Sequence, residues 1–467
     1  MNHTHGQARL WRTLAGLALA GLFAGACGNS GDDDVASDAT TTTADGGSEA
    51  GSDELVPLSG VPGVTDEEIA FAVLGTGAAS SPIGGCQLTC YVAGIEAYFD
   101  YRNSEGGVHG RQLVIGEVLD DELMNNQVKA LEIVQDEEAF GVFALPVLPS
   151  GFPELGESGM PVYAVTANAP ESAGYDNIFN LSGASCLRCS RPYYPHVASL
   201  VGASKVGALA YGVSQGAKDC SAGQVASFER WGDDLGVEVG YQNDDLAYGL
   251  PNGIAPEVTA MKDAGVDVVF MCTDANAVLT LEQELERQGM SDVVVFMQQS
   301  IGDPTIFERG GSLIEGNVSF TLSVPGFAPG EAAATYSEWI AKSEISADEM
   351  AHTYAVQGWL NAATAYAGLV AAGPEFDQAG VVAATNGIED FTADGLMPPM
   401  DWGRQHEPWT EDDPSANGPD PTCVIFGEAV DGEWRLFAED PAKPWSCWDA
   451  EALTGDVLPE PDQLAFE

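Results

Sequence analysis

The chain has 467 residues, and its 71 acidic side chains against 17 basic ones give a formal net charge of -54 at pH 7. This length exceeds what one hydrophobic core usually serves, so more than one domain is expected, and the hydrophobic fraction of 45% is that of a globular protein. The charge argues against nucleic acid as a partner, because phosphate binding requires clustered Lys and Arg.

The first 27 residues have the pattern of an export signal. Arg9 and Arg12 precede the apolar run LAGLALAGLFAGA (residues 14–26), which is too short to span a bilayer. Small residues lead directly into Cys27, an arrangement similar to a bacterial lipobox, in which the cysteine is lipidated. We expect acyl chains on Cys27 to anchor the protein to the outer face of the bacterial cytoplasmic membrane. An ordinary signal peptide, cleaved near this point, is the alternative.

Residues 28–65 are predicted to be a disordered tether. Their first part, GNSGDDDVASDATTTTADGGSEAGSDE, is rich in Asp, Thr, Gly and Ser. It has too few apolar residues to form a core, and its negative charges repel one another. We therefore expect a globular body that is joined to the membrane anchor by a flexible tether.

Beyond the tether, apolar runs alternate with helical patterns, which predicts a parallel α/β sheet. The first series of predicted strands covers residues 69–74, 113–119, 140–145 and 162–165. Helices are expected between these strands. One has an apolar stripe of Val92, Ile95 and Phe99, and the next passes through Val128, Leu131 and Val134.

A second series of the same kind follows. Its predicted strands cover residues 206–211, 237–241, 266–272, 293–297 and 316–323. Helices are expected around residues 225–235 and 278–285. Two doubly wound units in succession could be separate domains or two lobes of one binding protein.

The last part of the chain combines a long helix with a segment rich in Trp and Pro. The helix has an apolar stripe from Val356 to Val370, and short strands are expected at residues 423–426 and 434–437. Trp402 and Trp409 are expected to cover a sheet edge or fill a small core rather than reach a ligand.

A segment of the first series carries a family resemblance. YFDYRNSEGGVHGRQLVIGEVLDDE (residues 98–122) resembles the start of the type I periplasmic binding proteins, in the family of branched-chain amino acid receptors. The matching positions are Asn103, Gly106, Gly107, Val108, Gly110, Arg111, Asp120 and Asp121. MPVYAVTANAPES (residues 160–172) resembles the next family marker, and AGVDVVFMCTDAN and LERQGMSDVVVFMQQ resemble strands of the second lobe.

The resemblance, which extends from Glu67 to Ala438, implies an α/β fold with two doubly wound, Rossmann-like lobes. Three hinge segments would join the lobes, and the ligand cleft would lie between them. On this basis we expect the following division: residues 66–182 and 301–395 in the first lobe, 183–300 and 396–450 in the second, and 451–467 as a tail.

The turn Gly75-Thr76-Gly77 after the first strand is then one wall of the solute cleft. A dinucleotide-binding fingerprint would require a third glycine at position 80, which is Ser80, and an acidic residue at the end of the second strand. The Asp pair at that strand end already belongs to the family pattern. We therefore expect no nucleotide site here.

In the family, hydroxyl side chains and backbone N–H groups of the first lobe hold the solute. Carried over by position, the expected contacts are Ser150, Thr166 and Asn168, with Ser80 and Ser81 from the first loop. An ordinary turn or helix-cap role is the alternative for each serine.

The second lobe departs from the family pattern at three positions. Amino acid receptors have a tyrosine where Cys220 stands, an aromatic residue at Asp274 and a glutamate near Ser300. A solute with an ammonium group would take Asp274 as its partner, because a buried ammonium needs a carboxylate. Asp274 could equally cap the helix that follows it. By position, Cys220, Asp274 and Ser300 are the expected solute contacts of this lobe, so the departures concern the solute rather than the fold.

Eight cysteines remain besides Cys27, and an even number in an exported protein predicts structural disulfides. We expect near neighbours to pair: Cys86 with Cys90, Cys186 with Cys189, Cys220 with Cys272, and Cys423 with Cys447. The Cys186-Leu-Arg-Cys189 spacing would also suit a redox motif or half of a zinc site. It has no second CxxC or His pair beside it.

The sequence favours a binding protein without cofactor or metal over an enzyme. It has no G-x-S-x-G or H-E-x-x-H motif, and no recognisable catalytic setting surrounds His109, His196, His352 or His406. The resemblance implies a monomeric, membrane-tethered protein that captures a small polar solute, such as an amino acid or a related amide or carboxylate. Its expected partners are an ABC permease and the ATPase subunits. A ligand sensor of the same fold is the alternative function.

Overall fold

The computed structural model describes residues 55–80, 86–165, 169–181, 187–298, 305–350, 353–406, 423–438, 440, 442–448 and 455–465. For residues 169, 170, 305 and 348 it describes the backbone alone. The chain divides after Ser52, and all described residues lie in the unit Asp53–Glu467. The predicted signal, Cys27 and residues 28–54 of the tether lie outside them. Residues 55–65, predicted as the end of the disordered tether, instead pack on the body: the carbonyls of Val56 and Thr65 accept hydrogen bonds from the Arg111 guanidinium at 2.8 and 2.6 Å. Within the described ranges, no helix combines the length and the apolar character that a membrane crossing requires.

The first sheet has five parallel strands in the order β2-β1-β3-β4-β5. Their bounds are Glu68–Gly75 (β1), Gln112–Asp120 (β2), Gly141–Leu145 (β3), Val162–Ala164 (β4) and Ile178–Asn180 (β5). The strand order reverses between β1 and β3, which is the switch point of a doubly wound sheet. We call this sheet and the helices packed on it the first lobe.

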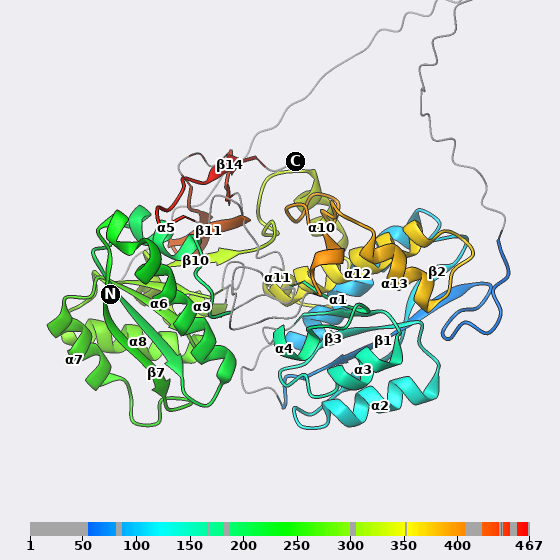
Figure 1. Cartoon of the computed structure of the whole chain (residues 1–467), viewed down its shortest axis with the longest axis horizontal. Coiled ribbons are helices and arrows are strands. Elements are labelled where there is room, and N and C mark those ends of the chain that lie inside the picture. The colour runs from blue at the N-terminus through cyan, green and yellow to red at the C-terminus, as the bar shows by residue number, and fades with distance from the viewer. Residues whose placement is uncertain are drawn as a thin grey trace, which may run out of the picture. The chain divides into compact units, whose positions relative to one another are not determined.

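Helices cover both faces of the first sheet, which is why β1 and β3 consist almost entirely of apolar residues. Phe71 and Val73 face one helical layer, whereas Ala72 and Leu74 face the other. The first layer is formed by α1 (Gln87–Ser104), α10 (Glu331–Ile340), α12 (Thr353–Ala372) and α13 (Gln378–Asn386), and the second by α2 (Asn126–Asp136) and α3 (Phe152–Ser158) (Figure 1). The short helices α4 (Ala169–Ser172) and α11 (Ala347–Met350) and the 3-10 turn η2 (Trp402–Arg404) complete this part of the chain.

The contact between α1 and α12 depends on two glycines. A Cβ atom on Gly94 would lie 1.9 Å from the carbonyl oxygen of Ala355, and one on Gly358 would lie 2.1 Å from the carbonyl oxygen of Tyr91. The two backbones can approach so closely only because both positions lack a side chain. This contact brings a helix near residue 90 against one near residue 360, so segments far apart in sequence form one layer.

The second sheet has nine strands, with β14-β13-β11-β10-β9-β8-β6-β7 in order and β12 paired to β11. Its parallel part consists of β6 (Lys205–Tyr211), β7 (Glu238–Leu246), β8 (Val268–Cys272), β9 (Val294–Met297) and β10 (Val318–Thr321). The antiparallel part adds β11 (Cys423–Val430), β12 (Glu433–Leu436), β13 (Trp445–Cys447) and β14 (Asp462–Leu464). We call this sheet and its helices the second lobe.

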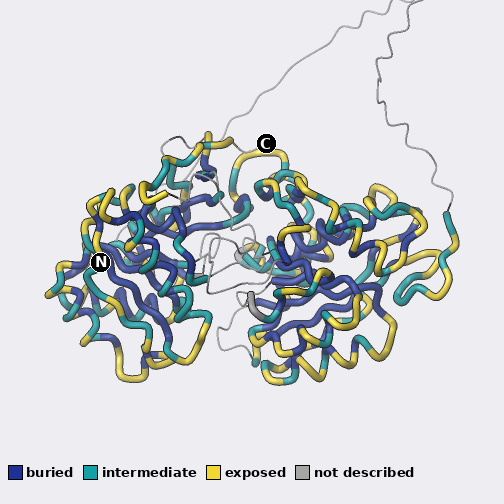
Figure 2. The backbone as a smooth tube through the Cα atoms, viewed as in Figure 1, coloured by how far each residue is buried: buried dark blue, intermediate teal, exposed yellow. Residues whose placement is uncertain are grey.

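The second sheet is also covered on both faces. Val206, Phe270 and Phe296 pack against α5 (Tyr193–Leu200) and α6 (Gln215–Leu235). Leu209, Met271 and Val295 face the opposite layer, formed by α7 (Ala255–Ala264), α8 (Ala275–Gln288), α9 (Thr305–Gly310) and the 3-10 helix η1 (Gly311–Ile314). Figure 2 shows the buried backbone following the strands and the exposed backbone following the outer turns of both lobes.

The predicted α/β fold with two doubly wound sheets is confirmed, but three predicted lobe boundaries are wrong. Strand β10 pairs with β9 and β11, so the chain leaves the second sheet after Thr321 and not near residue 300. Trp402 contacts Phe179 and Phe391, so the first lobe continues beyond residue 395. Strand β14 extends the second sheet into the predicted tail. Apolar runs reveal the presence of strands and helices, but not the sheet that each one joins.

Candidate functional site

The carboxyl ends of parallel strands meet at one edge of a sheet, which is where α/β proteins hold their ligands. In the first sheet, Gly75 at the end of β1 pairs in register with Asp120 at the end of β2 and with Leu145 at the end of β3. The loops that follow these residues are therefore brought together. They carry Ser80 and Ser150, two of the predicted solute contacts.

The Gly75-Thr76-Gly77 turn is locked to its two neighbouring loops. Asp120 Oδ1 accepts a hydrogen bond from the Gly77 N–H at 2.9 Å, and a Cβ atom on Gly77 would lie 2.2 Å from Asp120 Oδ2. The hydroxyl of Thr76, which is fully buried, accepts the Val147 N–H at 3.0 Å. Glycine suits this position because the Asp120 carboxylate, held by its hydrogen bond to the Gly77 N–H, occupies the space of a side chain.

A second network holds the loop that contains Ser150. Asp121 is fully buried, and its Oδ2 accepts a hydrogen bond from Asn126 Nδ2 at 3.1 Å. Asn126 Oδ1 in turn accepts the Gly151 N–H at 2.8 Å, at the start of α3. Of the two Asp residues of the family pattern, Asp120 therefore fixes the loop after β1, and Asp121 fixes the loop after β3 through Asn126.

Of the five predicted contacts in the first lobe, the structure describes two. Ser80 is partly buried in the turn after Gly77, and its N–H donates to the Gly77 carbonyl at 3.1 Å. Ser150 is exposed, and its N–H donates to the Leu148 carbonyl at 2.9 Å. Ser81, Thr166 and Asn168 lie outside the described residues. A role in solute binding remains a prediction for all five.

In the second lobe, Asp274 lies directly after β8 and caps α8. Its Oδ1 accepts the Ala277 N–H at 3.0 Å, so the helix-cap interpretation of the sequence is confirmed. Its Oδ2 accepts a hydrogen bond from the hydroxyl of Tyr211 at 3.1 Å. Burial and the nearby charge of Asp274 raise the pKa of Tyr211, so this phenol stays protonated and donates.

Tyr211, the last residue of β6, was not predicted as a site residue. Its ring lies 5.1 Å from that of Tyr248, which follows β7 and is 46% exposed. Because β6 lies between β7 and β8, the two tyrosines and Asp274 form a cluster at the carboxyl edge of this sheet. The signal that could have revealed Tyr211 is its position at a strand end, once the strand order is known.

Several large apolar side chains are exposed in loops that follow the carboxyl ends of parallel strands. In the first lobe these are Met124 after β2 and Leu148 after β3, and in the second they are Val213 after β6, Tyr248 after β7 and Phe327 after β10. Exposed apolar groups that gather at a ligand-carrying edge can contact an apolar part of a solute.

Cys220 lies in α6 and forms a disulfide with Cys272, the last residue of β8, across a Cα–Cα distance of 6.1 Å. This predicted pair is confirmed, and it fixes α6 to the strand that leads into Asp274. Cys220 therefore has no free thiol with which to meet a solute. Ser300 lies outside the described residues, so its predicted contact stays a prediction.

Two further predicted disulfides are confirmed. Cys86 pairs with Cys90 at the start of α1, and Cys423 pairs with Cys447 across β11 and β13. Cys189 is also disulfide-bonded, but its predicted partner, Cys186, lies outside the described residues. Glu349 lies beside Cys86 and Cys90, in a grouping that could hold a metal if the cysteines were free. Their mutual bond removes the two thiolates that such a site would need.

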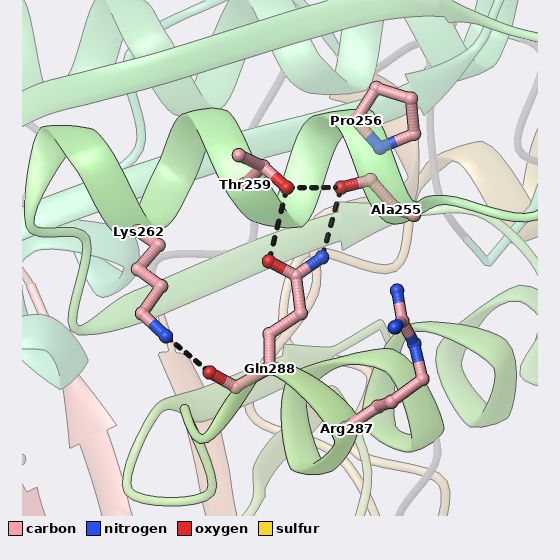
Figure 3. A pocket seen from close by; sticks show the side chains of 6 residues that line it. All are labelled: Ala255, Pro256, Thr259, Lys262, Arg287 and Gln288. Carbon is pink, nitrogen blue, oxygen red and sulfur yellow. Dashed lines mark hydrogen bonds between the residues drawn. The ribbon is translucent and has the colours of Figure 1, made fainter.

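An open hollow of about 580 Å³ lies between α7 and α8 (Figure 3). Its polar side chains already have hydrogen-bond partners on α7 and α8. Gln288 Nε2 donates to the Ala255 carbonyl at 3.0 Å, Lys262 donates to the Gln288 carbonyl, and Arg287 Nε donates to Glu284 at 2.7 Å. We interpret these contacts as a clamp between two helices rather than a solute site.

Comparison with known proteins agrees with this geometry. Residues 73–412 match the family described as "Periplasmic binding protein". No curated protein is significantly similar to the chain in sequence. The family match, which spans most of the chain, assigns the protein to the periplasmic binding proteins rather than to an enzyme family, as predicted.

Solved structures of the same fold cover most of the chain. A solute-binding protein of an ABC transporter from R. palustris, in complex with 4-hydroxybenzoate, is 18% identical, with a TM-score of 0.61 over 80% of this chain and 96% of its own. A branched-chain amino acid ABC transporter protein from Thermus thermophilus, with bound valine, is 16% identical, with a TM-score of 0.60 over 80% and 96%. A fatty acid ABC transporter substrate-binding protein from Thermomonospora curvata is 17% identical, with a TM-score of 0.60 over 86% and 97%. The chain thus has the type I fold of these structures, and it belongs to the periplasmic binding protein family.

Proposed function

We propose that this protein captures a small solute outside the cytoplasmic membrane by closure of its two lobes and delivers it to an ABC importer. The observation that carries the proposal is the cluster of interlocked loops at the carboxyl edge of the first sheet, together with the Tyr211–Asp274 pair at the carboxyl edge of the second. Binding energy would close the lobes, and the closed form would be the one that the permease and its ATPase subunits receive.

The solute is an amino acid or a related amide or carboxylate with an apolar part. Hydroxyl and N–H groups near Ser80 and Ser150 can hold a polar end, whereas Leu148, Val213 and Tyr248 offer apolar surface. The bound valine and 4-hydroxybenzoate of two structures with the same fold both combine a carboxylate with an apolar body. Thr166, Asn168 and Ser300 are further proposed contacts.

The proposed location is the outer face of the cytoplasmic membrane. Residues 1–27 would act as a lipoprotein signal, acyl chains on Cys27 would form the anchor, and residues 28–54 would act as a flexible tether between the anchor and the binding body. A monomer on such a tether can present either lobe to a permease in the same membrane.

A thermal-shift screen of the chain from Asp53 onward tests the proposal. The panel holds branched-chain, polar and aromatic amino acids, their amides, short and aromatic carboxylates, urea and sugars. A solute at a hundred times its dissociation constant should add about 2.7 kcal/mol of stability. If no compound of the panel raised the thermal midpoint, the proposed solute class would be contradicted. If only sugars raised it, the solute would be a sugar instead.

The substitution Asp274→Asn separates the two roles of this side chain. Asparagine keeps an oxygen for the Ala277 N–H, so α8 stays capped, but the negative charge is lost. If the solute has an ammonium group that meets Asp274, the affinity should fall by about 10²-fold or more. An uncharged or anionic solute should bind with unchanged or higher affinity.

Asp245→Asn is the matched control, because Asp245 lies near the end of β7 and is mostly exposed. Isothermal titration of both variants with the strongest solute from the screen gives the comparison. Equal losses in the two variants would mean that general surface charge, and not Asp274, governs the affinity.

A further inference from the structure

A second cavity, of about 240 Å³, lies in the second lobe beneath the C-terminal part of the chain. Its apolar wall includes Leu200, Leu235 and Phe437, and its polar groups include those of His196, Ser446 and Glu460. The volume corresponds to about eight water molecules at their density in the liquid. This cavity can therefore accept a small organic molecule.

The segment that closes the cavity is residues 455–465, which we call the C-terminal strap. Its Gly455 carbonyl accepts a hydrogen bond from Trp231 Nε1 at 3.2 Å, and its Pro459 carbonyl accepts one from Trp448 Nε1 at 3.0 Å. Gln463 Nε2 donates to the Ser446 hydroxyl at 3.1 Å, and β14 pairs with β13. The strap is thus held in place along its whole length.

The cavity is separate from the edge that would carry the transported solute. Leu200 and Leu235 are the last residues of α5 and α6, from which the chain enters the amino ends of β6 and β7. Tyr211 and Asp274 lie at the opposite, carboxyl edge of the same sheet. Most of the lining, including Phe437, Ser446 and the strap, also lies beyond residues 73–412, which match the family.

His196 gives the cavity its chemistry. Its ring packs 5.3 Å from that of Trp448 and 6.0 Å from that of Phe426, and within the described part of the chain its imidazole has no hydrogen-bond partner. Burial lowers the pKa of His196 to about 4, so the ring is neutral at neutral pH. A neutral imidazole offers one donor and one acceptor, and a hydroxyl compound can use either.

The charge around the cavity limits what can bind. Glu460 is the only other titratable residue of the lining, and no cation accompanies it. With the net charge of -54, this lining disfavours anions. We propose that the cavity is a second binding site, for a small uncharged molecule that has an apolar body and one hydroxyl or amide group. The apolar body would contact Leu200, Leu235 and Phe437, and the polar group would bond to His196.

Benzyl alcohol is a suitable probe, because it is uncharged at every accessible pH and small enough for the cavity. Saturation-transfer NMR on the full chain should show the probe bound at millimolar concentration. Leu235→Trp, which fills the apolar wall, should abolish this signal. His196→Phe keeps a ring of similar shape against Trp448 but removes both nitrogens, and it should weaken binding about fivefold.

Tyr248→Ala at the carboxyl edge is the matched control, and it should leave the affinity for benzyl alcohol unchanged. If Leu235→Trp does not fold, as judged by its thermal midpoint, His196→Phe alone decides the test. Absence of any signal from the wild-type protein overturns the proposal. It is equally overturned if both cavity variants bind the probe as the wild type does, or if the Tyr248→Ala variant loses it.

Discussion

Glu282→Gln is expected to raise the free energy of unfolding by about 3 kcal/mol near pH 8 and to change it little near pH 4. Glu282 lies in α8 and is only 6% exposed. Its Oε1 accepts a hydrogen bond from Asn317 Nδ2 at 2.5 Å, and Asn317 Oδ1 accepts the Val295 N–H at 2.9 Å. Among the described residues, no cation pairs with this carboxylate. Burial therefore raises the pKa of Glu282 to about 7.

The direction of the effect follows from the proton balance. Between pH 4.5 and about 7, Glu282 holds its proton in the folded protein, whereas the unfolded chain has lost it. The contribution of protonated Glu282 to the free energy of unfolding is complete below pH 4.5, and it is lost as the pH rises through about 7. Glutamine keeps an acceptor for Asn317 and has no charge to bury, so the variant should not show this loss.

Urea unfolding of the wild type and the variant across this pH range measures the difference. Glu284→Gln is the control in the same helix. Hydrogen bonds from Arg287 and Gln288 lower the pKa of Glu284, so its substitution should destabilise the protein at neutral pH rather than stabilise it. If the free energy of unfolding changed with pH in the same way for the wild type and Glu282→Gln, the Glu282 carboxylate would not be buried as the structure shows.

The strands could be predicted from the sequence because strands covered on both faces must be apolar throughout. Residues 69–74 and 206–211 were expected to form strands, and β1 and β6 differ from these ranges by at most one residue at either end. The strands β5, β13 and β14 were missed, because three residues are too few to show a period, whereas the equally short β4 lies in the apolar run of residues 160–165. The order of the strands, and hence the lobe boundaries, depends on pairings that no local pattern records.

The helix α2 shows a different limit. An apolar stripe through Val128, Leu131 and Val134 indicated the helix correctly, yet Val128 is 62% exposed and Leu131 is 39% exposed. The buried face instead contains Asn126, Ala130 and Ile133. The side chain of Asn126 is buried because its amide forms hydrogen bonds both to Asp121 and to the loop before α3. Hydrophobic periodicity cannot reveal a polar residue that is buried for its hydrogen bonds.

The candidate site shows what a resemblance adds and where it ends. It pointed to the carboxyl edges of both sheets and to Asp120, Asp121 and Asp274, all of which lie at strand ends there. It did not indicate Tyr211, because the partner of Asp274 depends on β6 and β8 being neighbours. Trp402 is fully buried in the first lobe against Phe179, as expected for a core residue. Trp409 lies outside the described residues.

The double substitution Cys220→Ala/Cys272→Ala is expected to lower the free energy of unfolding by about 4 kcal/mol. This disulfide joins residues 52 positions apart, the longest loop among the three described bonds. A crosslink removes more conformational freedom from the unfolded chain as the closed loop grows. The same relation gives about 3 kcal/mol for Cys423–Cys447, which are 24 positions apart, and about 2 kcal/mol for Cys86–Cys90, which are 4 apart.

Urea unfolding of the three double variants without reductant tests this order. The same measurement on the wild type and the Cys220→Ala/Cys272→Ala variant with reductant is the control, because reduction removes the crosslink from the wild type without changing a side chain. The Cys220–Cys272 bond also holds α6 against the end of β8, two residues before Asp274. Loss of this bond should therefore lower the affinity for the solute that the screen identifies, because the strand end that carries Asp274 would no longer be fixed to α6. Equal destabilisation by all three variants would refute the loop-length explanation. Unchanged solute affinity in the Cys220 variant would show that the carboxyl edge of the second sheet is rigid without its crosslink.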